Sequence, residues 1–178
     1  MKHKVLKKQG NSRLCAVCGT ENPFGFESRF YETDQNEVVG IFKTKELQQS
    51  FPGRVHGGII SAMLDEGIGR SIWITEPDSW AVTVELNIKY KEPIPLDKTL
   101  ICVGRVTRNT RRLFEGSGEI ILEDGTVAVE ATGKFWKMPP DQIGMDTSTD
   151  WWILDEEDPT EIEIPEPPKK EKSFMGTK

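Results

Sequence analysis

Residues 56–67 read HGGIISAMLDEG, two glycines followed by an apolar stretch that carries an acidic pair. The stretch predicts a helix from Gly57 to about residue 74, because its isoleucines and leucine recur every four residues: Ile60, Leu64, Ile68 and Ile72. A helix start offers unpaired N–H groups and a positive dipole end, and glycines there let a carbonyl come close. Asp65 is costly on such a helix unless it is paired or functional. The combination indicates chemistry on an acyl group.

Strand-like patterns lie on both sides of this helix. Two precede it, at residues 26–31 and 37–42, and four follow it, at residues 81–90, 99–107, 113–122 and 126–136. Asp124-Gly125 between the last two is a strong hairpin signal. Two strands, one helix and four strands favour an α+β fold, an antiparallel sheet with one long helix packed on its face.

The chain divides into three zones. Residues 1–22 form a polar leader with Cys15-x-x-Cys18, residues 23–138 hold the regular patterning, and residues 139–178 form an acidic, Pro-rich tail. The tail has the composition of a segment that forms no core of its own. Its apolar residues 151–154, WWIL, are the exception, and we expect them to dock on the same subunit or on a neighbour.

Composition excludes several function classes. The 178 residues carry a net charge of −6 and have a pI of about 5.1, which argues against nucleic acid or an anionic membrane as partner. No apolar run reaches the roughly 18 residues of a membrane helix. The basic start has no apolar segment behind it, so we do not expect it to be a secretory signal. Three cysteines give no sign of an oxidising compartment, so we expect a cytoplasmic protein.

The sequence resembles a known family over residues 23–138. His56-Gly57-Gly58 followed by Asp65, and residues 82–90 with Pro93, are similar to the hotdog-fold acyl-CoA thioesterases. The similarity is to the phenylacetate-type (PaaI-like) group of the 4-hydroxybenzoyl-CoA thioesterase superfamily. The leader, with its Cys15-x-x-Cys18-Gly19, also looks like one found in a branch of this group. The resemblance implies a hotdog fold and a homodimer, or a homotetramer built as a dimer of dimers.

The resemblance also implies roles for individual residues. Acyl-CoA would bind between two subunits, where the Gly57 N–H polarises the thioester carbonyl. Asp65 would act as nucleophile or general base, and Thr83 would help to place water. Ser50 stands where the family has Asn or Gln. With Gly58 and Ser61 it completes the expected substrate-binding set on this part of the chain.

The spacing of Gly57 and Asp65 in the sequence also predicts a dimer. Gly57 and Asp65 are eight residues apart, which puts them about 12 Å apart along one helix. An oxyanion donor and an attacking group must both reach one carbonyl within about 3 to 3.5 Å. If both residues are catalytic, two antiparallel helices from two subunits must supply them.

Each of these residues also has a plain structural interpretation. Asp65 would then be a buried acid bonded to a neighbouring hydroxyl, and His56 would cap the helix rather than bind the ligand carbonyl. Thr83 in a strand is usually only a strand residue, so its role rests on the resemblance. Glu66 has the spacing of a surface salt bridge with Arg70 and is not expected to be catalytic.

We expect neither a metal nor a cofactor. Cys15 and Cys18 have the spacing of half a zinc ribbon, but the chain has no second pair. Cys102 lies in an apolar strand and is expected in the core. A two-plus-two site across a dimer and a redox pair are the alternatives.

Two further groups concern the substrate. The turn of residues 108–112 carries a basic cluster that would meet the phosphates of coenzyme A or else be a solvated hairpin: Arg108, Arg111 and Arg112. Met63, Phe51 and Trp73 favour an apolar acyl group.

The resulting hypothesis is hydrolysis of an acyl-CoA thioester to free acid and coenzyme A. One alternative is hydration or dehydration of a 3-hydroxyacyl thioester, for which His56 is the one candidate base. The other alternative is a non-catalytic acyl-CoA binding module, in which the Trp151-Trp152 segment would bind a partner protein.

Overall fold

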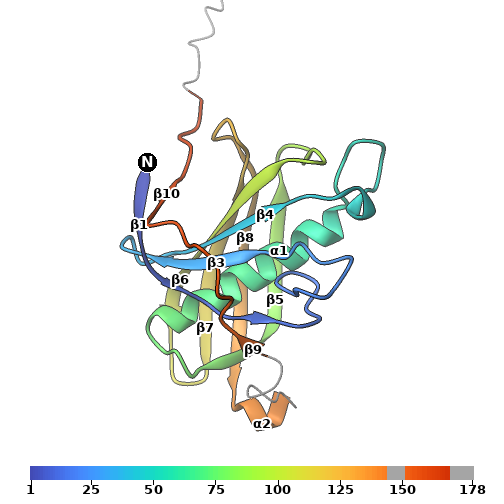
Figure 1. The fold of residues 1–178 in the computed structure, drawn as a ribbon. Helices are drawn as coiled ribbons and strands as arrows, with labels where there is room; N and C mark the ends of the chain where they lie inside the picture. The colour runs from blue at the N-terminus through green and yellow to red at the C-terminus, as the bar shows by residue number, and fades with distance from the viewer. Residues whose placement is uncertain (144–150, 169–178) are drawn as a thin grey trace, which may run out of the picture.

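The computed structural model describes residues 1–143 and 151–168 (Figure 1). One long helix, α1 (Gly57–Arg70), continues into a 3₁₀ turn at Ser71–Ile74, and short helices lie at Glu46–Gln48 and at Pro140–Ile143 (α2). The strands are β1 (Lys2–Lys8), β2 (Asn11–Ser12), β3 (Arg29–Thr33), β4 (Val38–Lys43), β5 (Trp80–Tyr90), β6 (Thr99–Asn109), β7 (Leu113–Ile121), β8 (Val127–Met138), β9 (Trp151–Trp152) and β10 (Glu161–Glu163).

Eight strands form one antiparallel sheet in the order β10-β1-β3-β4-β6-β7-β8-β5. Helix α1 crosses this sheet (Figure 1), and its apolar side supplies core residues that are at most 1 % exposed: Ile60, Met63, Leu64 and Ile68. Strand β5 lies at one edge of the sheet, so one of its sides has no strand beside it. This is the predicted antiparallel sheet with one long helix on its face.

The predicted helix and its six flanking strands are present. The strand ends differ by up to three residues, and α1 ends four residues before the predicted end, where the 3₁₀ turn begins. The expectation that regular structure is confined to residues 23–138 is wrong. The leader contributes β1 to the main sheet, and the tail contributes β10, which pairs with β1. The boundaries at residues 22 and 138 remain a prediction about domain organisation, but sheet formation crosses both.

Opposite charges hold the leader to the tail. Lys8 is buried, yet its Nζ lies 2.9 Å from Glu156 Oε1 and 2.8 Å from Asp158 Oδ1. Lys2 Nζ lies 3.2 Å from a carboxylate oxygen of Glu161 across the β1–β10 pair. These ion pairs join the acidic tail to the basic leader.

The apolar tail residues dock as expected. Strand β9 pairs with β2, Trp151 lying opposite Ser12. The Trp151 ring packs edge-on against Trp73 and Trp80, with centroids 5.2 and 5.4 Å apart. In the described part of the chain this docking is within one subunit.

Helix α1 lies unusually close to β6. A Cβ atom added at Gly104 would lie 2.1 Å from the carbonyl oxygen of Gly67 on the helix. Only a residue without a side chain fits there. The close approach fixes how far the helix stands above the sheet, and so how α1 is placed against β5.

We expect Gly104→Ala to lower the free energy of unfolding by about 3 kcal/mol, because backbone must move to admit the methyl group. Gly69→Ala is the matched control. Its added Cβ would lie 3.5 Å from Phe135, an ordinary contact, and alanine is favoured over glycine in a helix by up to about 1 kcal/mol. Urea unfolding of both variants measures the difference, and equal stabilities would refute the close packing.

Candidate active site

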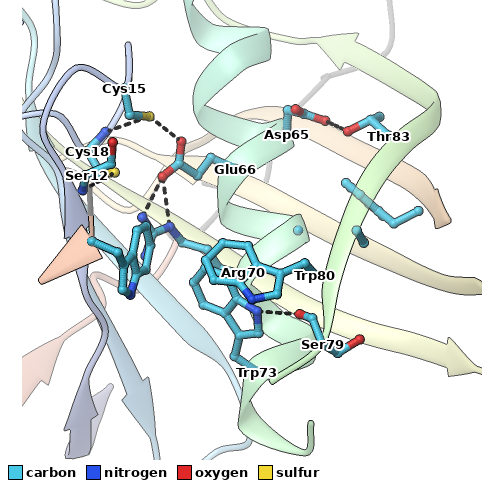
Figure 2. A pocket seen from close by; sticks show the side chains of 14 residues that line it. Ser12, Cys15, Cys18, Asp65, Glu66, Arg70, Trp73, Ser79, Trp80 and Thr83 are labelled. Carbon is cyan, nitrogen blue, oxygen red and sulfur yellow. Dashed lines mark hydrogen bonds and ion pairs between the residues drawn. The ribbon is translucent and has the colours of Figure 1, made fainter. Parts of the chain in front are cut away.

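A cavity of about 310 Å³ lies beside α1 and the first residues of β5 (Figure 2). Four aromatic side chains form its apolar wall: Trp73, Trp80, Phe135 and Trp151. Asp65 and Thr83 line it on one side of the helix, and Cys15, Cys18 and Glu66 on the other. Trp80, Phe135 and Trp151 were not among the predicted site residues, although Trp151 stood out as apolar within an acidic tail.

Asp65 is half-buried on α1, and its carboxylate is directed at β5. The Thr83 hydroxyl donates a hydrogen bond of 2.6 Å to Asp65 Oδ1 (Figure 2). Burial raises the pKa of the Asp65 carboxyl above its ordinary value, while the bond from Thr83 lowers it. Among the described residues the Asp65 carboxylate therefore has one hydrogen-bond partner, with an apolar wall and open space beside it. This is the environment of a general base or nucleophile.

A β-bulge in β5 brings Thr83 to this position. The register with β8 shifts between Thr83 and Glu85. Before the shift Ala81 and Thr83 face the cavity, and after it Leu86 and Ile88 pack against the core. Without the extra residue, alternation would place either Thr83 or the pair Leu86 and Ile88 on the other face of the sheet.

The helix start is built by capping. Nδ1 of His56 accepts the Gly58 N–H at 3.0 Å, so the expected alternative of His56 as the cap is what the structure contains. The first N–H groups of a helix have no partner within it. The Gly58 N–H is bound by His56 Nδ1, and those of Ile59 and Ile60 by the His56 carbonyl, so in the described part of the chain the Gly57 N–H is the one left for a ligand. The hydroxyl of Tyr90, which the sequence did not single out, lies 2.8 Å from the Gly57 carbonyl oxygen and 2.7 Å from Ser61 Oγ.

Gly57 and Asp65 do not share a cavity within one chain. Gly57 lies in a second hollow of about 220 Å³, which it lines together with Tyr90 and Pro93. Asp65 lies in the first, two turns further along α1. The structure therefore keeps the two key residues apart, as helix geometry required.

Other predicted substrate contacts lie away from the Asp65 cavity. Ser50 is exposed, and its Oγ accepts the Phe51 N–H at 2.6 Å. The basic residues of the β6–β7 turn are exposed, and Arg108 lies 3.4 Å from Glu115. The three residues expected to shape an acyl pocket lie in three different places. Trp73 lines the cavity, whereas Met63 is buried in the core and Phe51 is 78 % exposed.

The predicted pair of Glu66 and Arg70 forms, but it is not a surface pair. Arg70 is 2 % exposed, and its Nε and Nη2 donate to Glu66 Oε1 at 2.9 and 2.6 Å. Its guanidinium also lies over the rings of Phe30, Trp73 and Trp151. Glu66 is therefore held in one orientation by a buried partner.

No helix among the described residues has the length and apolar character needed to cross a membrane.

Comparison with known proteins identifies related sequences. Residues 52–129 match the family model of the thioesterase superfamily. The mouse acyl-coenzyme A thioesterase THEM4 is 33 % identical over 124 residues, which are 68 % of this chain and 53 % of that protein. The human acyl-coenzyme A thioesterase THEM5 is 29 % identical over 136 residues, 75 % of this chain and 54 % of that protein. The chain thus spans about half the length of these curated relatives.

Solved structures share the arrangement of sheet and helix. A thioesterase superfamily protein has a TM-score of 0.63 at 28 % identity, covering 69 % of this chain and 63 % of the other. The Escherichia coli PaaI protein, from the phenylacetic acid degradation operon, has a TM-score of 0.57 at 15 % identity, covering 64 % and 80 %. The second likeness bears on the fold alone.

Proposed function

Because the chain carries a thioesterase superfamily domain over residues 52–129 and has the hotdog fold, we propose that it hydrolyses acyl-CoA thioesters at a site shared by two subunits. The mouse and human relatives named above are acyl-coenzyme A thioesterases. One observation carries the proposal for this chain. Asp65, bonded to Thr83, faces a cavity with an aromatic wall, while the Gly57 N–H, which has no hydrogen-bond partner among the described residues, lies in a separate hollow of the same subunit.

The free edge of the sheet supports pairing with a second copy. Strand β5 is eleven residues long and exposed along most of its length, and Val84 on it is 56 % exposed. Trp136 on the neighbouring strand β8 is 42 % exposed. A long, exposed edge strand with apolar side chains invites pairing unless another chain covers it. Pairing two copies along β5 sets their α1 helices side by side and antiparallel, which brings Gly57 of each copy towards Asp65 of the other.

In this arrangement each residue has a defined task. The Asp65 carboxylate takes a proton from water, and the resulting hydroxide attacks the thioester carbon. The Gly57 N–H of the other subunit and the dipole of its helix stabilise the oxyanion. When the C–S bond breaks, the proton on Asp65 neutralises the departing thiolate. Direct attack by Asp65, with hydrolysis of the resulting anhydride, uses the same geometry.

The surroundings indicate the kind of substrate. The rings of Trp73, Trp80 and Trp151 around the cavity favour an apolar acyl group. Arg108, near the end of β6, and Arg111 and Arg112, in the β6–β7 turn, are exposed and would contact the coenzyme A phosphates by charge-assisted hydrogen bonds.

The test is release of free thiol from short, medium, long and aromatic acyl-CoAs, with binding measured in parallel. Turnover of at least one class supports hydrolysis and identifies the acyl group. Binding without thiol release would refute it and favour a non-catalytic acyl-CoA module. Addition or loss of water at a 3-hydroxyacyl thioester, with the thioester intact, would instead favour the hydratase alternative.

We expect Thr83→Val to reduce kcat about tenfold, a loss of about 1.4 kcal/mol for one hydrogen bond to a charged group. The valine keeps the branched shape but cannot donate to Asp65, whereas Thr83→Ser should retain most of the rate. Thr107→Val, on an exposed position of β6, is the matched control. Steady-state thiol release measures kcat for all three variants. An unchanged kcat in Thr83→Val would show that Thr83 makes no contribution to catalysis.

A further inference from the structure

Cys15, Cys18 and Glu66 bring two sulfur atoms and a carboxylate oxygen within 4.8 Å of one another (Figure 2). None of the three has a place in the hydrolysis proposed above. We propose that they bind a thiophilic divalent cation of the zinc type, with its fourth coordination position facing the cavity that contains Asp65. The proposal does not depend on the hydrolytic function.

The loop that carries the cysteines directs backbone N–H groups at sulfur. Cys15 Sγ accepts from the N–H groups of Val17 and Cys18 at 3.2 and 3.4 Å, and Cys18 Sγ accepts from Ser12 at 3.4 Å. Three donors aimed at two sulfur atoms stabilise negative charge on them. A loop that served only to pack Cys18 against the core would not need these bonds.

Tight winding of the loop holds this geometry. The Gly19 N–H donates to the Cys15 carbonyl at 3.0 Å, and a Cβ atom at Gly19 would lie 2.3 Å from that carbonyl oxygen. Asn22 braces the loop from outside, where its side-chain amide donates to Leu14 O at 3.1 Å. Both sulfurs are therefore fixed relative to each other before any ligand arrives.

Glu66 is presented as a third ligand by Arg70. Arg70 binds only Oε1 of Glu66, and Oε2 lies 3.0 Å from Cys15 Sγ. The thiol donates to that oxygen, so a cation would replace a proton between the two atoms. A buried partner that orients a ligand from behind is usual at protein metal sites.

Charge balance favours a divalent cation. Two thiolates and one carboxylate carry three negative charges, which a divalent cation and Arg70 balance. An uncompensated set of charges at this depth would be costly.

The donor set selects the kind of metal. Two thiolates with one carboxylate suit zinc better than calcium or magnesium, which prefer oxygen ligands alone. Tetrahedral zinc requires donor atoms about 3.4–3.8 Å apart, so side-chain shifts below about 1 Å would suffice. Three protein ligands leave the fourth position to water or to a cavity ligand. No metal was expected from the sequence because the cysteines have no second pair nearby. The third ligand comes from α1, far along the chain.

The experiment uses the whole chain, reduced and stripped of metal by a chelator, titrated with Co²⁺ and then Zn²⁺. We expect one Co²⁺ per chain, thiolate-to-cobalt charge-transfer bands, visible bands of four-coordinate strength, and their loss when Zn²⁺ is added. Cys15→Ser should weaken binding about 100-fold, and Glu66→Gln should weaken it while keeping the thiolate bands. Cys102→Ala, at the buried cysteine outside the cluster, should bind as the parent does. Zn²⁺ should also raise Tm in the parent but not in Cys15→Ser.

Three outcomes would overturn the proposal. They are no cobalt binding by the folded parent chain, binding that survives Cys15→Ser unchanged, and half a metal per chain with the spectrum of four thiolates. The last would mean a site shared between two chains. Circular dichroism confirms folding of each variant, and no readout involves thioester turnover, so failure here is distinct from failure of the proposed hydrolysis.

Discussion

The Asp65→Asn variant is expected to lose acyl-CoA hydrolysis by about 10²–10⁴-fold and yet to melt at a higher temperature than the parent chain. Both effects have one cause, a carboxylate kept charged where a neutral group would be more stable. Asparagine keeps an oxygen that accepts the Thr83 hydroxyl, so the helix and β5 stay in place. It has neither the basicity to activate water nor the charge to attack a thioester.

The stability gain depends on pH in a defined direction. Burial raises the pKa of Asp65 in the folded chain, so the folded state binds this proton more tightly than the unfolded state does. The folded state therefore loses stability as the pH rises from the ordinary pKa of a carboxyl group to the raised pKa of Asp65 in the folded chain. The difference in Tm between Asp65→Asn and the parent chain should be largest at neutral pH. It should become smaller as the pH falls through the range between these two pKa values.

Thiol release and calorimetry at several pH values measure the two effects. Asp78→Asn is the matched control, because Asp78 lies on an exposed turn and its loss should change neither turnover nor Tm. A variant of Asp65 that keeps its activity, or that melts at a lower temperature, would contradict the assigned role.

Two inactive variants should restore activity when combined in one dimer. Gly57→Pro is expected to lower kcat about 10²–10³-fold by removing one oxyanion donor. Proline suits the first position of a helix, and His56 before it has the extended ψ of 132° that proline requires. An added Cβ at Gly57 would lie 3.5 Å from Tyr90, an ordinary contact. The substitution thus removes an N–H at a position whose backbone suits proline.

A dimer with Gly57→Pro in one subunit and Asp65→Asn in the other has both defects in the same site. Its second site combines an intact Gly57 with an intact Asp65, so the purified mixed dimer should recover about half of the parent activity. Co-expression with two different tags isolates that species. Gly57→Ala, which retains the N–H, should remain active throughout. A mixed dimer as inactive as either variant alone would refute a site shared between subunits.

The central part of the fold was predictable because its residues encode it locally. The four-residue spacing of isoleucine and leucine identified α1, and alternating strands around Asp124-Gly125 identified the hairpin. The resemblance to the hotdog thioesterases is confirmed by the family match over residues 52–129 and by the related structures. Asp65 and Thr83 were predicted as site residues, and the structure places them in contact, whereas their catalytic roles stay a prediction.

The strands at the two ends of the chain were not predictable from local pattern. Residues 2–8 contain five basic side chains and no clean alternation, so they gave no strand signal. They form a strand by pairing with β3 on one side and, on the other, with residues 161–163, which are far away in sequence. The one available clue was complementary charge, a basic leader and an acidic tail in the same molecule.

The surroundings of the cavity were missed for the same reason. Trp80 and Trp151 come from segments some seventy residues apart and meet edge-on, 5.4 Å between centroids. Glu66 was interpreted as one half of a helical salt bridge, which it is. Nothing within its own helix indicated that its second oxygen faces a cysteine of the leader.

The pairing of leader with tail also bears on how the molecule forms during synthesis. Helix α1, with Asp65 and the strand that carries Thr83, leaves the ribosome well before residues 151–164 have been made. Until then β1 has an open side and the cavity lacks its Trp151 wall. Long-range pairing of this kind is slow and leaves apolar surface uncovered meanwhile. The nascent chain therefore passes through a stage with an open β1 edge and an unfinished pocket, to which a chaperone could bind.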